Sequence, residues 1–331
     1  MRAPDRFVER SLLLLALSSL GILGSITFFI LREGAPLVYH VGLANFFSTD
    51  WHPTAGHYGI TLMIVGSTLV TAGALILGVP LGVACAIVLG EMAPARVHLL
   101  LKPTIEILAG IPSVVYGFMG IVVVLPFIRQ HFGGPGASGL AAAVILGVMI
   151  LPTVIAISLD ALQAVPQSYR EGSLAMGATQ WQTIWRVVLP GARSGVVAAV
   201  ILGMGRALGE TMAVVMVAGN AVELPHSPLD PLRTLTANLA LEMGYAAGDH
   251  RSALFATGIV LFLAIVVLNA AAGLARRRPR KPGARREFSA VGAGHLAPEP
   301  RAPALDAARL ATPAAMPAAS DRPPLTFRGS P

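Results

Sequence analysis

The chain has 331 residues, of which 54% are hydrophobic and only 12% are charged, and its mean hydropathy is +0.70. Soluble domains carry about 25% charged residues, so this composition excludes an ordinary soluble protein and predicts an integral membrane protein. The net charge of +7 would suggest nucleic-acid binding in a soluble protein. Here the basic residues flank apolar segments and fill the C-terminal region, so we expect no nucleic-acid partner. The single Cys85 excludes a disulfide framework, and the histidines lack metal-site spacing.

Six apolar stretches are each long enough to cross a bilayer as a helix, which takes about 20 residues. The second and third are longer than a bilayer requires, so we expect them to tilt or kink, with Pro80, Pro103 and Pro112 as kink points. The first has no small-residue cleavage site and predicts an uncleaved helix. The predicted fold class is therefore all-α and integral to the membrane. The six predicted spans are Ser11–Leu31, Gly59–Leu89, Val97–Phe127, Gly139–Leu162, Gly195–Ala218 and Ser252–Ala275.

Basic residues gather before the first span, in the second and fourth connections, and after the sixth span. The positive-inside rule assigns these segments, and hence both termini, to the cytoplasm. The outer connections are then residues 32–58, 128–138 and 219–251.

The chain divides into three predicted regions. Residues 1–10 form a cytoplasmic N-terminus and residues 11–278 a six-helix transmembrane domain, with a cytoplasmic loop at 164–194. Residues 279–331 are basic and rich in Ala and Pro, which predicts a disordered cytoplasmic tail. The arginines that follow the sixth span serve as a topology signal or contact anionic membrane lipid.

The fourth connection contains the sequence "EGSLAMGATQWQTIWRVVLPGARSG", from Glu171 to Gly195. Its pattern predicts a short helix, a break at Gly177, which permits a left-handed or tight backbone, and a second helical stretch. Pro190 suits the first turn of a helix that leads into the membrane. On periodicity alone, the segment could also be an amphipathic helix lying on the bilayer. Four large apolar residues in it fall at helical spacing, as on one face: Trp181, Ile184, Trp185 and Val188.

This loop resembles the cytoplasmic "EAA" loop of ABC-importer permeases. The resemblance implies a type I importer architecture in which the loop docks on an ATPase subunit. Three positions depart mildly from the family pattern, because Gly172 and Ser173 stand where two alanines are usual and Val187 replaces isoleucine. The matching positions are Glu171, Gly172, Ser173, Gly177, Val187, Leu189 and Pro190.

Three further segments resemble the PstC type of phosphate importer permease: "FFSTDWHP", "ILAGIPSVVYGFMGIVVVLP" and "GRALGETMAVVMVAGN". The resemblance covers about residues 7–275 and leaves the tail unexplained. It implies phosphate transport across a bacterial inner membrane. It also implies three kinds of partner: a PstA-like permease, a PstB-like ATPase dimer and a PstS-like external phosphate-binding protein.

Arg206 and Glu210 are charged residues near the middle of the fifth predicted span. An arginine at a helix centre costs about 2.5–3.5 kcal/mol to insert, so its presence requires an explanation. The two side chains, one helical turn apart, could neutralise each other. Alternatively, Arg206 attracts a phosphate and Glu210 accepts a hydrogen bond from its protonated oxygen, a preference that sulfate cannot satisfy. The resemblance associates these two charged positions with phosphate passage. Thr211 and Asn220 could supply further donors, but helix packing or polarity at the end of a helix is the favoured interpretation of both.

We expect no enzymatic activity in this chain, because neither Lys102 nor Lys281 follows a glycine as an ATP-binding Walker A loop requires. No cofactor is expected in the chain itself, and the resemblance implies that ATP and Mg²⁺ bind the partner ATPase. Within the class, a permease for another oxyanion or a PstA-type subunit is the alternative. A secondary transporter or channel is a different class, but it would show inverted repeats and leave the inner loop unexplained.

Overall fold

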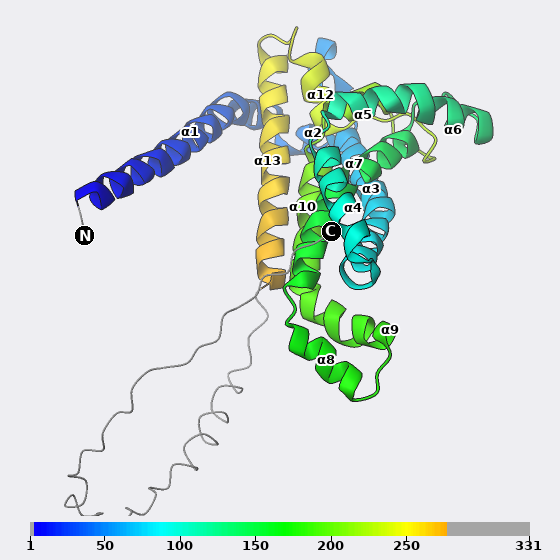
Figure 1. The fold of residues 1–331 in the computed structure, drawn as a ribbon. Helices are drawn as coiled ribbons and strands as arrows, with labels where there is room; N and C mark the ends of the chain where they lie inside the picture. The colour runs from blue at the N-terminus through cyan, green and yellow to red at the C-terminus, as the bar shows by residue number, and fades with distance from the viewer. Residues whose placement is uncertain (1–2, 277–331) are drawn as a thin grey trace, which may run out of the picture. The chain divides into compact units, whose positions relative to one another are not determined.

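The computed structural model describes residues 3–276, so the predicted tail at 279–331 lies outside the described residues. The regular secondary structure of the described residues is helical apart from one short two-stranded antiparallel hairpin and a single bridge between Gly219 and Leu232 (Figure 1). The longer helices are α1 (Ala3–Val41), α3 (Thr61–Ile87), α4 (Ala95–Ala109), α7 (Gly139–Gln163), α10 (Leu189–Leu208) and α13 (Asp249–Arg276). The shorter helices are α2 (Leu43–Phe46), α5 (Ser113–Met119), α6 (Leu125–His131), α8 (Gln167–Ala175), α9 (Gln180–Thr183), α11 (Met212–Val217) and α12 (Leu235–Glu242). The hairpin strands are β1 (Trp51–His52) and β2 (His57–Tyr58), joined by a 3-10 turn η1 (Pro53–Ala55), and π-helical turns occur at η2 (Val88–Met92), η3 (Gly120–Val124) and η4 (Ile184–Val188).

Six helical segments of the described residues are long and apolar enough to cross a membrane, which confirms the predicted all-α membrane class. The first, fourth and sixth agree with the predicted spans apart from their ends. The third and fifth differ in ways that affect function. The six segments are Glu9–Val41, Thr61–Met92, Ser113–His131, Gly139–Gln163, Gln180–Leu208 and Asp249–Ala270.

The predicted third span, Val97–Phe127, is wrong as a single helix. Helix α4 ends at Ala109, and α5 begins at Ser113 in a new direction (Figure 1). Pro112 has no backbone N–H and disfavours helical geometry in the preceding residue, so the helical ladder stops here. The Tyr116 hydroxyl donates to the Leu108 carbonyl at 2.9 Å, which ties the two helices together across the break.

The predicted fifth span, Gly195–Ala218, is wrong at both ends. The helix runs without interruption from α9 through η4 into α10, and α10 ends at Leu208. Pro190 therefore lies inside this continuous run, directly after the π-helical turn η4, and does not begin a separate helix as predicted. After Leu208 the chain leaves the helix, and a separate helix, α11, begins at Met212. The charged pair therefore spans a helix break.

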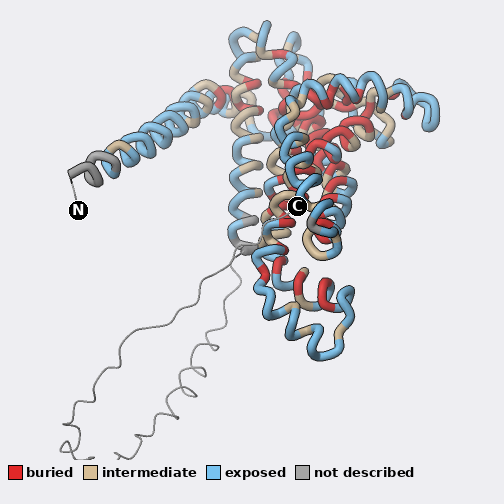
Figure 2. The backbone as a smooth tube through the Cα atoms, viewed as in Figure 1, coloured by how far each residue is buried: buried red, intermediate tan, exposed pale blue. Residues whose placement is uncertain are grey.

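Helices α3 and α7 pack together through small residues and form the centre of the transmembrane region. A side chain at Gly78 would come within 2.7 Å of the Gly147 carbonyl oxygen, and one at Gly82 within 2.8 Å of Val154. Gly203 of α10 approaches Val154 in the same way. Small residues let helix backbones approach closely, so dispersion contacts stabilise this packing in lipid. Buried positions concentrate in α7, where 61% of the most apolar window is buried (Figure 2).

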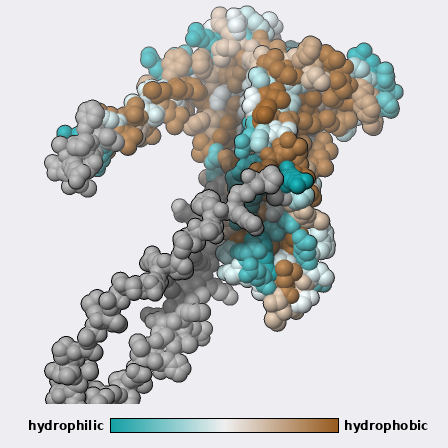
Figure 3. Space-filling model, in the orientation of Figure 1, coloured by the Kyte–Doolittle hydropathy of each residue, from teal (hydrophilic) through white to brown (hydrophobic). Residues whose placement is uncertain are grey.

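Helix α1 contacts the other helices near its C-terminal end only. Gly34 allows α1 to cross α13, because a side chain there would lie 2.6 Å from the backbone nitrogen of Ala256. Residues 12–26 of α1 are exposed (Figure 2), and their surface is mostly hydrophobic (Figure 3). Such a surface requires lipid or another membrane chain to cover it.

The two ends of the helical region carry different elements. Helices α8 and α9 lie beyond one end, where α13 finishes, whereas α12 lies at the other end, where α13 begins (Figure 1). Hydrophilic side chains gather near the α8–α9 segment (Figure 3).

Candidate functional site

Arg206 lies in the last turn of α10 and is partly buried. Within residues 3–276 its guanidinium makes no hydrogen bond or ion pair, and Glu210 does not pair with it. The Arg206 guanidinium lies close enough to the phenol of Tyr116, in α5, to interact with it electrostatically. The alternative in which the two residues neutralise each other on one helical face is wrong, because α10 ends before Glu210. Arg206 is therefore a cation in an apolar region whose charge this part of the chain leaves unpaired.

Glu210 lies in the break between α10 and α11. Its Oε1 accepts a hydrogen bond from the backbone nitrogen of Ala213 at 3.2 Å, which satisfies a free N–H in the first turn of α11. Its backbone carbonyl accepts the hydroxyl of Thr236, in α12, at 2.8 Å. The Glu210 carboxylate therefore caps the start of α11, and the Glu210 backbone is held to α12.

Thr211 and Asn220, the two further predicted donors, make local contacts. The Thr211 hydroxyl lies 3.4 Å from the Gly209 carbonyl. The side-chain amide of Asn220 donates to the Val215 carbonyl at 2.7 Å, and its positive φ of 56° ends the segment after α11. The structure thus places Thr211 beside Glu210 in the break, and Asn220 beyond the far end of α11.

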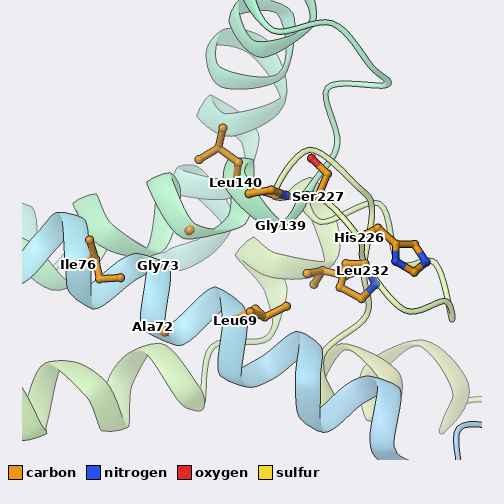
Figure 4. A pocket seen from close by; sticks show the side chains of 12 residues that line it. Leu69, Ala72, Gly73, Ile76, Gly139, Leu140, His226, Ser227 and Leu232 are labelled. Carbon is orange, nitrogen blue, oxygen red and sulfur yellow. The ribbon is translucent and has the colours of Figure 1, made fainter.

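The space around these residues within the chain is small. Glu210, Ser67 and Thr71 line a cavity of about 10 Å³. A larger pocket of about 360 Å³ lies between α3, α7 and the 225–232 segment (Figure 4). Its lining is mainly apolar, includes Leu69, Ile76 and Leu140, and contains neither Arg206 nor Glu210. Neither space offers an anion a charged binding site of adequate size.

The predicted ATPase-coupling loop forms two short helices joined at Gly177. Gly177 has φ of +84°, which confirms the predicted left-handed backbone. Glu171 and Gly172 are exposed on α8, and the Ser173 hydroxyl lies 2.9 Å from that of Thr183, so it joins α8 to α9. A reciprocal capping box between Thr179 and Gln182 starts α9. The loop is thus a preformed helical hairpin with an exposed outer face.

Three predicted positions of this loop lie where the chain enters the membrane helix. Val187 is partly buried in η4, and Leu189 and Pro190 begin α10. The four apolar residues at helical spacing differ in their burial within the chain. Ile184 and Val188 are buried, whereas the side chains of two tryptophans stay about half exposed and pack edge to face with ring centroids 5.6 Å apart: Trp181 and Trp185.

An ion pair between Glu91 and Arg170 fixes this loop to α3. Arg170 Nη2 donates to Glu91 Oε1 at 2.7 Å and Nε to Oε2 at 3.1 Å, a two-point contact with both side chains mostly buried. The sequence interpretation counted Arg170 only as a topology charge. Two features of the sequence could have indicated this ion pair. Arg170 stands directly before Glu171, and the Glu91 carboxylate stands at the end of the second span.

A second buried polar cluster, which sequence reasoning missed, lies at the end of the region that carries α12. The carboxylate of Glu242 accepts from Arg233 at 2.6 Å, from His250 at 2.8 Å and from Trp51 at 3.1 Å. Arg233 Nε also donates to the Asn220 carbonyl at 2.9 Å, which connects the cluster to the segment after α11. These residues come from the hairpin, the α11–α12 connection, α12 and α13. The cluster therefore fixes four elements around one buried carboxylate.

Burial raises the pKa of Tyr58, which packs on Trp51 in the hairpin, and the Asp249 carboxylate raises this pKa further. The phenol therefore remains neutral at physiological pH.

The family model for the binding-protein-dependent transport system inner membrane component matches residues 78–281. The chain belongs to this family. The matched range includes the α8–α9 hairpin and the α10–α11 break, and the predicted resemblance is confirmed. The chain is accordingly a multi-pass membrane protein of the ABC-importer permease class.

Two curated relatives illustrate the similarity. The phosphate transport system permease protein PstC of Pasteurella multocida (strain Pm70) is 36% identical over 263 residues, which cover 73% of this chain and 82% of the relative. The probable ABC transporter permease protein YqgH of Bacillus subtilis (strain 168) is 47% identical over 221 residues, which cover 65% of this chain and 72% of the relative.

Solved structures share the fold. A bacterial ABC transporter involved in the import of the acidic polysaccharide alginate aligns with a TM-score of 0.54 and 15% identity, covering 85% of this chain and 100% of that chain. An inward-facing MetNI methionine ABC transporter aligns with a TM-score of 0.52 and 22% identity, covering 69% of this chain and 98% of that chain. These alignments establish the type I permease architecture.

Proposed function

We propose that this chain is a permease subunit of an ATP-driven importer of inorganic phosphate and forms half of the translocation path. The observation that carries the proposal is Arg206, a partly buried guanidinium without a partner among the described residues, at the α10–α11 break. The relatives of this chain include PstC proteins, which are phosphate transport permeases. Contact with a transported anion would therefore explain why the chain keeps a costly cation at this position. A planar guanidinium matches two phosphate oxygens at once.

Glu210 next to the anion path gives selectivity and weak binding. Phosphate at neutral pH carries one or two protons and can donate a hydrogen bond to a carboxylate, whereas sulfate carries none. One carboxylate oxygen, Oε1, contacts the start of α11, so Oε2 is the oxygen proposed to receive this bond. The negative charge also prevents tight anion binding, which transport requires because the substrate must leave. Thr211 supplies a hydroxyl at the same break, and Asn220 stands at the far end of α11.

The exposed α8 face with Glu171, and the Gly177 turn, form the proposed docking site of a PstB-like ATPase dimer. A PstA-like permease completes the path, and a PstS-like protein delivers phosphate from outside a bacterial inner membrane. Both termini of this chain are cytoplasmic in this arrangement, in keeping with its basic residues. ATP and Mg²⁺ bind the partner ATPase, since neither lysine of this chain follows a glycine.

Uptake by the complete transporter in proteoliposomes tests the proposal. We expect phosphate uptake that requires ATP inside and the external binding protein, with sulfate neither transported nor competing. Phosphate uptake without ATP, or equal uptake of phosphate and sulfate, would refute it. The same vesicles lacking this chain are the control.

A further inference from the structure

We propose that Glu91 and Arg170 are positioning residues that transmit movement of the ATPase-docking hairpin to α3 and α7. The inference rests on the proposed function, because it assigns a mechanical role to a contact beside the docking helix. Glu91 lies in the π-helical turn η2 that ends α3, and Arg170 lies in α8, directly before the exposed Glu171. Their two-point contact is mostly removed from solvent, with side-chain exposures of 9% and 15%. A planar, desolvated contact of this kind resists both sliding and rotation.

Arg170 also fixes the end of α7. Its Nη2 donates to the Leu162 carbonyl at 2.8 Å and its Nη1 to the Val165 carbonyl at 2.6 Å. Leu162 lies in the last turn of α7, and Val165 lies in the short connection between α7 and α8. One guanidinium thus joins α8 to both α3 and α7.

A second attachment holds the other half of the hairpin to the same turn. Gln180, the first residue of α9, donates from its side-chain amide to the Glu91 backbone carbonyl at 2.8 Å. Both hairpin helices are therefore bonded to one residue of η2. A π-helical turn is a common site of local adjustment in a helix, so force applied to the hairpin acts on α3 at a deformable point.

Helix α3 extends from this contact to the charged break. Ser67 and Thr71, in the opposite half of α3, line the same small cavity as Glu210. Ser67 also accepts a hydrogen bond from the Leu235 backbone nitrogen at 2.9 Å, at the start of the helix whose Thr236 anchors Glu210. A contiguous set of contacts thus links the docking hairpin to the proposed anion path. A shift of α3 relative to α10 would alter the surroundings of Glu210.

The test measures phosphate imported per ATP hydrolysed by the complete transporter in proteoliposomes. We expect Glu91→Gln and Arg170→Lys to leave ATP hydrolysis within about twofold of wild type. The imported phosphate per ATP falls about fivefold in each, within the range that residues of coupling networks produce. The double variant is no worse than the more impaired single variant by more than about twofold, because both changes weaken the same contact. Glu223→Gln, which neutralises an exposed carboxylate far along the chain, leaves the ratio unchanged.

An unchanged ratio in the assembled variants overturns the proposal. Proportional loss of hydrolysis and import, or failure of both single variants to assemble with the ATPase, also overturns it, since the pair is then only structural. These results are distinct from a failure of the proposed function, in which the wild-type transporter imports no phosphate. If wild type imports another anion, the same ratio is measured for that anion.

Discussion

Replacing Arg206 by glutamine separates a substrate-binding role from a structural one. Within the described residues its guanidinium has no hydrogen bond or ion pair to lose. A hydrogen bond to a charged group contributes about 1.5–3 kcal/mol, so loss of the proposed contact with phosphate should lower uptake about 10–100-fold. Thermal stability of the purified complex should not fall, because a buried arginine is itself costly in an apolar helix. Arg206→Lys keeps the charge but lacks the planar guanidinium, so its phosphate uptake should lie between those of wild type and Arg206→Gln.

The matched control is Arg233→Gln, the same substitution at an arginine that is fully engaged. Arg233 bonds Glu242, Asn238 and the Asn220 carbonyl, and its removal leaves a buried carboxylate with fewer partners. This variant should destabilise the protein by about 3 kcal/mol. Uptake kinetics and melting temperature are measured on both variants. The reasoning is refuted if Arg206→Gln lowers the melting temperature as Arg233→Gln does, or if its phosphate uptake stays within about threefold of wild type.

Three further changes probe other parts of the structure. Glu210→Gln should keep the bond to α11 through its amide oxygen yet admit sulfate, and competition assays that still show sulfate excluded would contradict this. Gly177→Ala should weaken ATPase docking by about 1 kcal/mol, because alanine is strained at the positive φ of this position. Gly172→Ala, in helical α8, should leave docking unchanged. Equal binding of the ATPase by both variants argues against a role for the turn. Gly78→Ala should lower the melting temperature, because the added methyl group pushes α3 away from α7. Gly258→Ala should not, because no atom lies within 4 Å of the added methyl group. Similar melting temperatures for the two variants would count against close packing of α3 on α7.

Apolar run length predicted the membrane class and the number of spans, because burial in lipid depends on composition alone. Local rules also predicted the turn at Gly177, since a left-handed backbone is a property of glycine itself. They failed at Pro190, because the π-helical turn η4 before it continues the helix without a break. The break after Leu208 was not predictable in this way. Gly209 is one of 35 glycines, and others such as Gly78 and Gly203 lie within intact helices. The break also carries a hydrogen bond from the distant Thr236 to the Glu210 carbonyl.

Contacts between distant residues account for the other omissions. Trp51 and Glu242 are separated by 191 positions, so no spacing rule could bring them together. Ile184 and Trp185 illustrate a subtler limit. Helical spacing places both residues on one broad face, but packing against other helices decides that Ile184 is buried and Trp185 is not. The π-helical turn at η4 also changes the number of residues per turn from that of an α-helix.

The incomplete site is consistent with a path shared between two membrane chains. Arg206 offers a cation without a partner in the described residues, while the cavity beside Glu210 is about 10 Å³ and cannot contain phosphate. An anion site enclosed by this chain would need both features in one space of adequate volume. If a second permease instead supplies the opposite wall, the cation stays accessible until assembly, and the cost of burying it is offset when the anion arrives. The effect of Arg206→Gln on phosphate should then be measurable only in the complete complex, and phosphate should not stabilise this chain alone against heat.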